Sequence, residues 1–230
     1  MSSIVTREDW IVALPADARD AVTAAMRLVH VPRGDHVTEA GRPATAIHRL
    51  RSGLVRLTGA YPDGREALIT LYAPGAVFSE TALVAGRPYA HTKTAVIDCE
   101  VEVLDHDAFA MLHARFPAIP EALSRKFARV IARQLETREA QDTRSLGERV
   151  ARVFADLADA VGAQDGAGVR IEAPLSQAEL GAHLGVTRQS IQKEVTELKR
   201  RGLLAKREGH WLVDAAGLKR DLGRRDEFDL

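Results

Sequence analysis

The segment from residue 175 to residue 204, LSQAELGAHLGVTRQSIQKEVTELKRRGLL, constrains this chain more than any other part of it. Ser176 followed three residues later by Glu179 is the pattern of a capping box, so a helix is expected to begin there. Gly185 suits the left-handed conformation that ends a helix. Thr187 suits the cap of the next helix. The segment therefore predicts two helices joined by a tight turn.

The second of these helices is expected to have one apolar and one polar face. Ile191, Val195 and Leu198 recur at spacings of four and three, which places them on a buried stripe. The polar side chains near its N-terminal end fall on other faces, and these are Arg188, Gln189, Gln192 and Lys193. Residues so placed reach base edges when a helix lies in the major groove of DNA. The alternative is an ordinary surface hairpin of helices with solvated charges.

A short β-hairpin is expected next, because residues 203–213 carry Gly209 at their middle. A reading helix followed by a hairpin is the winged form of the helix-turn-helix. The chain has 32 basic and 32 acidic residues, so its formal net charge is zero. Between Thr187 and Arg207, however, seven Lys or Arg stand against two Glu, a local excess of five. Such a patch can bind phosphates although the whole chain is neutral.

The spacing of apolar residues changes along the first half of the chain, from a helical to a strand-like pattern. Residues 7–30 show apolar positions at spacing four, interrupted by Pro15 near a helix start, and predict helix. From about Val31 to Leu104, short β-type runs alternate with Gly and Pro turn signals, and Asp63-Gly64 is a good hairpin turn. This pattern predicts an antiparallel barrel or roll. The expected strands are 46–50, 53–58, 66–71, 92–95 and 100–104.

The second half is mostly helical in pattern. Residues 107–115 predict a short helix, and residues 118–142 one long helix with a continuous apolar stripe. Such a stripe between two domains favours self-association, and packing against the chain's own roll is the alternative. The residues expected at a dimer interface are Leu123, Phe127, Val130, Ile131, Gln134 and Leu135. A hinge at 144–147, a helix at 148–161, a flexible loop at 163–168 and a strand at 169–173 follow.

Composition excludes several classes of protein. A single cysteine, Cys99, allows neither a disulfide within the chain nor an iron–sulfur cluster with four thiolate ligands. No apolar run approaches the roughly 20 residues of a membrane span. The N-terminus lacks the apolar core of a signal peptide, so a cytoplasmic protein is expected. Metal-dependent enzymes built on β-rolls need converging ligands such as His-x-His, which the sequence does not contain. An enzyme is therefore not expected, and a β-roll metal enzyme stays as the alternative from another class.

With YPDGREALITLYAPGAVFSE in the roll and TRQSIQKEVTELKRRGLL near the end, the chain resembles the Crp/Fnr family of transcription regulators from about Val31 to Val213. The resemblance implies an α+β protein: an N-terminal antiparallel β-roll of the cyclic-nucleotide-binding type, a long dimerisation helix and a C-terminal winged helix-turn-helix. The expected domains are 1–116, 117–143 and 144–230. It also implies a homodimer that binds a palindromic operator in double-stranded DNA, with RNA polymerase as a further partner.

The resemblance assigns roles to residues of the reading helix. Arg188 matches an arginine that contacts guanine, and an arginine fork fits O6 and N7 of guanine. Gln189 stands where cyclic-nucleotide members carry glutamate, so the preferred operator is expected to differ. Lys193 replaces a second arginine and reads guanine less strictly. The full set expected to contact DNA is Ser176, Gln177, Thr187, Arg188, Gln189, Ser190, Gln192, Lys193, Lys206 and Arg207.

The expected effector site departs from the cyclic-nucleotide members. The glutamate that would meet a ribose hydroxyl is present as Glu80, in Ser79-Glu80-Thr81. The arginine that would neutralise a cyclic phosphate is replaced, because Tyr89 and Ala90 stand in its segment. A buried phosphate without a cation is heavily penalised, and Arg87 is the nearest substitute. Gln134 and Leu135 replace the two hydroxyls that would face an adenine.

The identity of the effector therefore stays open. A small ligand other than cyclic AMP is expected in the roll, and a cyclic-nucleotide regulator with an unusual phosphate cassette is the alternative. A form that is active without ligand is also open. Haem sensing needs an axial ligand such as histidine, and His48, His91 and His106 lie in or near the roll without forming a recognisable pair. Nothing near Cys99 indicates a reactive, exposed thiol.

Overall fold

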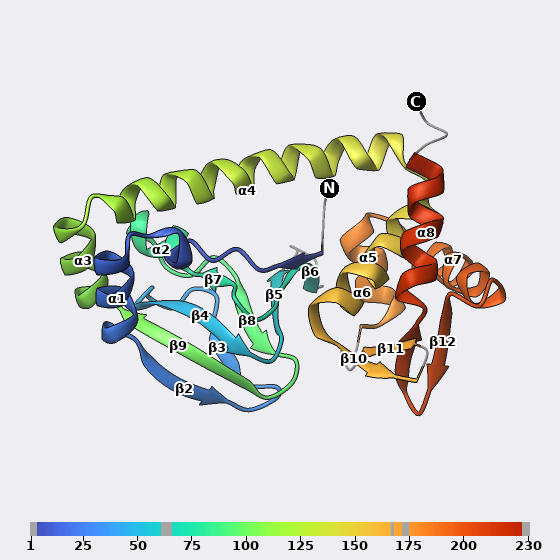
Figure 1. Ribbon diagram of the computed structural model, residues 1–230, viewed down its shortest axis with the longest axis horizontal. Helices are drawn as coiled ribbons and strands as arrows, with labels where there is room; N and C mark the ends of the chain where they lie inside the picture. Colours follow the sequence, from blue (N-terminus) through green and yellow to red (C-terminus); the bar gives the residue numbers. More distant parts are fainter. Residues whose placement is uncertain (1–3, 61–65, 167, 172–174, 227–230) are drawn as a thin grey trace.

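The computed structural model describes residues 4–60, 66–166, 168–171 and 175–226, as a β-roll and a smaller helical domain joined by one long helix (Figure 1). The roll and its helices comprise β1 (Val5–Thr6), a 3-10 turn (Ile11–Ala13), α1 (Ala16–Ala25), β2 (Arg27–Val31), β3 (His36–Thr38), β4 (Ala46–Ser52), β5 (Val55–Ala60), β6 (Glu66–Tyr72), β7 (Val77–Phe78), α2 (Glu80–Val84), β8 (Thr92–Ala95), β9 (Cys99–Asp105) and α3 (His106–Arg115). The elements that follow are α4 (Ala118–Thr143), α5 (Leu146–Val161), β10 (Gly162–Asp165), β11 (Gly168–Ile171), α6 (Gln177–Leu184), α7 (Arg188–Arg200), β12 (Leu204–Arg207), β13 (His210–Val213) and α8 (Ala215–Asp226).

The roll consists of two sheets, with strand orders β1-β6-β5-β8-β3 and β2-β9-β4-β7. All of its pairings are antiparallel except β1 with β6, which is parallel. The five strands expected from the sequence are confirmed within one or two residues at each end. The expected turn at Asp63-Gly64 lies outside the described residues. β3 and β7 were not expected, because two or three residues are too few to show an alternating pattern.

The helix expected within residues 7–30 is shorter in the structure, and it begins at the interruption expected at Pro15. α1 begins after Pro15 and ends at Ala25. The residues beyond it form β2, where Val29 faces Val101 of β9. Pairing with β9 therefore overrides the apolar spacing of four that continues to Met26.

The long helix α4 runs over the roll and continues to the second domain (Figure 1). The expected hinge at 144–147 is shorter in the structure, because α5 already begins at Leu146. Ser145 caps α5 in a capping box with Glu148, so only residues 144 and 145 join the two helices.

The second domain, called the reading domain below, comprises residues 145–226. Its sheet has the order β10-β11-β13-β12. α5 and α7 contact this sheet, α8 packs against α5, and α6 packs against α7. The flexible loop expected at 163–168 is wrong, because Gly162–Asp165 pairs with β11 as a hairpin. The hairpin expected at 203–213 is confirmed as β12 and β13, with Glu208 and Gly209 at positive φ in its turn.

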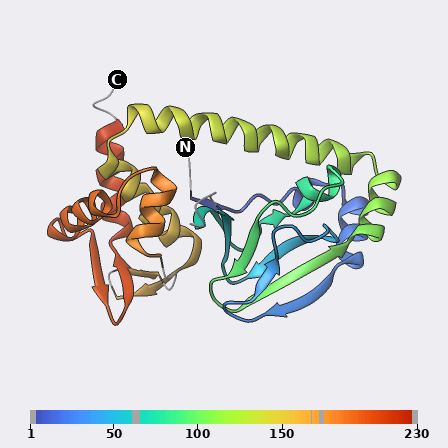
Figure 2. The same ribbon diagram turned by 180° about the vertical axis from the view of Figure 1, so that it is seen from behind.

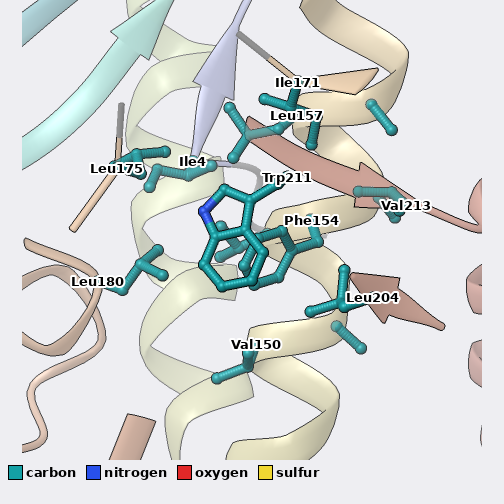
Figure 3. Packing of buried hydrophobic residues seen from close by; sticks show 14 of the residues in the cluster. Ile4, Val150, Phe154, Leu157, Ile171, Leu175, Leu180, Leu204, Trp211 and Val213 are labelled. Carbon is teal, nitrogen blue, oxygen red and sulfur yellow. The ribbon is translucent and has the colours of Figure 1, made fainter. Parts of the chain in front are cut away.

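One apolar cluster spans the roll and the reading domain. Leu54 and Leu68 of the roll belong to the same cluster as Leu180 and Leu184 of α6. Figure 3 shows Ile4, from the N-terminal segment, beside Phe154 and Trp211 of the reading domain. The two domains thus share a buried core. No helix in the described part of the chain has the length and apolar character that crossing a bilayer requires.

Candidate nucleic-acid interface and ligand pocket

The turn between α6 and α7 is fixed by caps that the sequence predicted. Ser176 Oγ accepts a hydrogen bond from the Glu179 amide at 3.1 Å, and Glu179 Oε2 accepts one from the Ser176 amide at 2.9 Å. Gly185 ends α6 with φ of 70°. Thr187 Oγ1 accepts a hydrogen bond from the Ser190 amide at 3.1 Å and begins α7. Both helix starts and the turn between them are therefore confirmed.

Gly181 allows the two helices to approach each other, and sequence reasoning missed it. A Cβ built at this position would lie 2.8 Å from the backbone oxygen of Val186. Real Cβ atoms essentially never come so close to a backbone atom. The signal in the sequence was a glycine inside an apparent helix, a residue that costs helix stability and is compatible with a close packing contact.

The outer face of α7 presents the side chains that were expected to read bases. Ile191, Val195 and Leu198 are buried, as their spacing predicted. Arg188, Gln189, Gln192 and Lys193 are exposed. Ser190 is half-buried, and its hydroxyl lies 2.9 Å from that of Thr187. Figure 2 shows α7 on the side of the reading domain away from the roll, so the roll does not cover this face.

Two of the basic side chains beside α7 are paired with carboxylates, so the patch carries less net positive charge than the number of its Lys and Arg residues suggests. Arg200 pairs with Glu197 at 2.7 Å, and Arg201 pairs with Asp221. Lys199 and Lys206 instead lie 5.3 and 5.6 Å from the centre of the Trp211 ring, which orients both ammonium groups beside β13. Lys206 and Arg207 are exposed on β12.

A pocket of about 350 Å³ lies where the roll, α4 and the reading domain meet. Its roll wall includes Leu57, Tyr72 and Phe78. Lys126, Phe127, Val130, Arg133 and Gln134 line it from α4. His183 of α6 also lines it, and the pKa of its imidazole is lowered by burial, partly offset by hydrogen bonds to the backbone of Leu68 and Ile69. A ligand in this pocket would touch all three parts of the molecule.

The structure brings only some of the expected effector residues to this pocket. Ser79, Glu80, Thr81 and Gln134 line it. Arg87 and Ala90 are exposed and do not line it, so Arg87 is not the substitute cation that the sequence suggested. Tyr89 is buried, but its hydroxyl already bonds to backbone groups of Thr45 and Ala46. Leu135 does not line the pocket and is exposed.

The carboxylate of Glu80, the expected ribose contact, already accepts hydrogen bonds from other side chains of the protein. Its Oε1 accepts hydrogen bonds from Trp10 Nε1 at 2.9 Å and from Lys126 Nζ at 2.5 Å. Ser79, just before it, has a φ of 82°, a conformation that costs energy for a residue other than glycine. Because the arginine is missing and Glu80 is engaged, the described residues do not fit a cyclic nucleotide held in the usual way of the family.

The apolar stripe of α4 divides into two faces. Leu123 is buried in the core of the roll, so it cannot contact a second copy, and its placement at a dimer interface is corrected. Phe127 and Val130 line the pocket on the same side. Ile131 and Leu135 lie on the other face and are 60% and 61% exposed. One part of the stripe therefore packs against the chain's own roll, and a second apolar face stays exposed.

The other groups considered from the sequence have structural roles. His48 is buried, and burial followed by the charge of Lys93 lowers the pKa of its imidazole to about 3. Burial also raises the pKa of the Cys99 thiol, which opposes reactivity. Within the described residues, no group of three or more His, Cys, Asp or Glu could hold a metal ion.

Comparison with known proteins gives the same arrangement. A model for the cyclic nucleotide-binding domain matches residues 28–116, and one for the Crp-like helix-turn-helix domain matches residues 148–221. The transcriptional regulator LdrP of Thermus thermophilus is 32% identical over 185 residues, which are 80% of this chain and 90% of LdrP. The CRP-like cAMP-activated global transcriptional regulator of Mycobacterium tuberculosis is 28% identical over 88% of this chain and 90% of its own. A crystal structure of a CRP-family transcriptional regulator, also from Thermus thermophilus, superposes with a TM-score of 0.67, at 30% identity over 85% of this chain and 96% of that one.

Proposed function

The chain belongs to the Crp/Fnr family of transcription regulators, and on that premise we propose that it binds an inverted-repeat DNA site as a homodimer under the control of a small ligand in the roll. It carries a DNA-binding helix-turn-helix and a cyclic nucleotide-binding domain, and its relatives are regulators rather than enzymes. The exposed polar face of α7 is the observation that carries the proposal. Arg188 reads guanine, Gln189 and Gln192 are placed for neighbouring bases, and Lys193 adds a second basic contact. The division into domains at 116 and 143 stays a prediction.

The dimer is supported by the uncovered apolar face of α4. Ile131 and Leu135 stand four residues apart and are both largely exposed. A second copy of the same helix would bury them in an isologous contact. Two reading helices related by a twofold axis would then enter major grooves about 34–36 Å apart. Ile131→Glu with Leu135→Glu should convert the dimer to monomers in analytical ultracentrifugation. Leu28→Glu should not, because it changes an exposed apolar position on β2, which lies across the roll from α4 in Figure 1.

Ligand control is supported by the position of the pocket. Its walls come from the roll, from α4 and from His183 on α6, so occupancy can change how the reading domain sits on the roll. The relative from Mycobacterium tuberculosis is named as cAMP-activated. The positive φ of Ser79 and the hydrogen bonds that Glu80 already accepts from Trp10 and Lys126 favour a different ligand here. Because coupling between two binding sites is reciprocal, operator DNA should tighten ligand binding by the same factor by which ligand tightens operator binding.

A selection over random double-stranded oligonucleotides with the purified full chain tests the function. We expect an inverted repeat with a guanine at the position read by Arg188. Arg188→Ala should weaken binding to the selected site by roughly 1–3 kcal/mol and relax the preference at that base pair. Arg200→Ala is the matched control, because Arg200 is on the same helix but is paired with Glu197. It should weaken binding slightly and equally for all sequences. Recovery of no inverted repeat at moderate salt would overturn the proposal.

A further inference from the structure

The charged side chains that line the pocket between the roll, α4 and the reading domain are paired with one another. Two are carboxylates, Glu8 and Glu80, and two are cations, Lys126 and Arg133, so their formal charges cancel. Lys126 Nζ donates to Glu80 Oε1 at 2.5 Å, and Trp10 Nε1 donates to the same oxygen at 2.9 Å. Arg133 Nη2 lies 3.6 Å from Glu8 Oε2. Each of these four charges thus has an opposite charge that the protein itself supplies.

An anionic ligand would have to break one of these pairs. The Glu8 side chain is 9% exposed, and its Oε1 also accepts a hydrogen bond from Arg129 Nε at 2.5 Å. Arg133 Nη1 donates to Thr6 Oγ1 at 2.7 Å, which fixes the guanidinium further. His183 adds no cation to the wall, because burial lowers the pKa of its imidazole. A ligand that took either cation would leave a buried carboxylate without its partner, which is strongly destabilising.

The rest of the pocket wall is apolar or neutral. The rings of Tyr72 and Phe78 stack with their centres 4.5 Å apart, and burial raises the pKa of the Tyr72 hydroxyl, which therefore stays neutral. Thr81 and Gln134 add two exposed, neutral groups that can form hydrogen bonds. The pocket thus offers a ligand mainly hydrophobic and aromatic surface. The side chains that supply this surface are Leu57, Ile69, Tyr72, Val77, Phe78, Phe127 and Val130.

We propose that the effector of this chain is a neutral, mainly apolar small molecule with one or two hydrogen-bonding groups, and not an anion. The proposal rests on the proposed function, because it names the chemical class of the ligand that controls the regulator. The cavity of about 350 Å³ lies near the lower end of the volumes of small-molecule sites, which suits a compact ligand. Burial of apolar ligand surface against the roll and α4 supplies the affinity. The neutral polar groups at Thr81 and Gln134 orient the ligand.

Two matched pairs of probes test the charge of the ligand on the purified full chain. Naphthalene-2-methanol is compared with 2-naphthoate, and 1-octanol with octanoate, at about pH 7.5, where both carboxylic acids are ionised. The members of a pair are similar in size and differ in charge. Saturation-transfer difference NMR gives Kd for each probe. We expect at least one alcohol to bind saturably and about tenfold more tightly than its carboxylate, because the carboxylate would lose its hydration without gaining a cation.

Substitutions at Val130, on the α4 wall, show whether the probes bind in this pocket. Val130→Trp fills the pocket and should abolish binding of the alcohol. Val84→Trp is the matched control, because Val84 is exposed on α2 and does not line the pocket, and it should bind as the wild type does. Val130→Lys is a second variant that adds a cation to the wall without adding a carboxylate. It should shift the preference towards the carboxylate member of each pair.

Four results would overturn the proposal. These are carboxylates that bind the wild type as tightly as the alcohols, no binding of either alcohol, full binding to Val130→Trp, and cyclic AMP that binds more tightly than both alcohols. The probes are titrated without DNA, and the selection over random oligonucleotides is made without the probes. Failure of the ligand class and failure of the regulator proposal are therefore distinguishable.

Discussion

The reading domain and the roll place their charged side chains in opposite ways. In the reading domain, Arg188 and Lys193 project from α7 into solvent, and the buried stripe below them is apolar. In the roll, Glu80 and Lys93 are buried, and Lys126 of α4 is buried against Glu80. The exposed charges cost little to hold and are available to a large partner. The buried charges are costly to hold, so their arrangement must be fixed by partners that come from several elements. Charge changes should therefore hardly affect stability in the first region and strongly affect it in the second.

The largest effect is expected from Lys126→Met. This substitution leaves Glu80 buried with Trp10 Nε1 as its remaining partner, so the free energy of unfolding should fall by about 3–5 kcal/mol. Arg125→Met is the neighbouring control, because Arg125 pairs with Glu121 on the helix surface, where an ion pair contributes about 0.2–1 kcal/mol. Urea unfolding followed by circular dichroism measures both. Similar losses for the two variants would mean that burial does not distinguish the two pairs.

The next largest effect is a change with pH in the free energy of unfolding, caused by the ammonium group of Lys93. Burial is the main cause that lowers the pKa of its ammonium group from 10.5 to about 8, and the charge of Glu80 acts in the opposite direction. Between these two pH values the unfolded chain still holds the proton that the folded chain has released, so stability should rise with pH. The difference in unfolding free energy between wild type and Lys93→Met should therefore change by roughly 3 kcal/mol over this range, in favour of the wild type. A difference that stays constant from pH 8 to 10.5 would show that Lys93 is solvated or fully paired.

The contrast between an exposed site on one helix and a buried site inside the roll explains what the sequence could predict. A site on one helix follows from caps and periodicity, so Ser176, Gly185, Thr187 and the stripe beginning at Ile191 were all correctly placed. A site inside the roll depends on which strands pair and on what α4 covers. Arg87 was expected there because it is near in sequence to the expected phosphate position, and in the structure it is exposed and does not line the pocket. Which side chains line the pocket depends on how the strands pair, and that pairing appears only in the folded chain.

Within the reading domain, an added methyl group should have opposite effects on stability at two glycines, Gly181 and Gly223. Gly181→Ala places a methyl group 2.8 Å from the Val186 oxygen, so the turn between α6 and α7 must shift. We expect a loss of about 1–3 kcal/mol in unfolding free energy, together with weaker operator binding, because α7 moves with the turn. Gly223→Ala in α8 has open space around its Cβ and should stabilise the chain by about 0.5–1 kcal/mol. If Gly181→Ala were neutral in both assays, the close approach would not determine the position of α7.

The smallest effect is expected at the boundary between the two regions. Arg56 of β5 pairs with Glu179 of α6 at 2.9 Å, and both side chains are partly exposed. Because the apolar cluster from Leu54 to Leu184 already joins the domains, loss of this pair in Arg56→Ala should cost about 0.5–1 kcal/mol. The Ser176–Glu179 cap does not depend on it, so α6 should stay intact. Arg51→Ala, which removes a pair within the roll, is the control. Two separate unfolding transitions in Arg56→Ala, one for each domain, would mean that this ion pair rather than the shared core couples the reading domain to the roll.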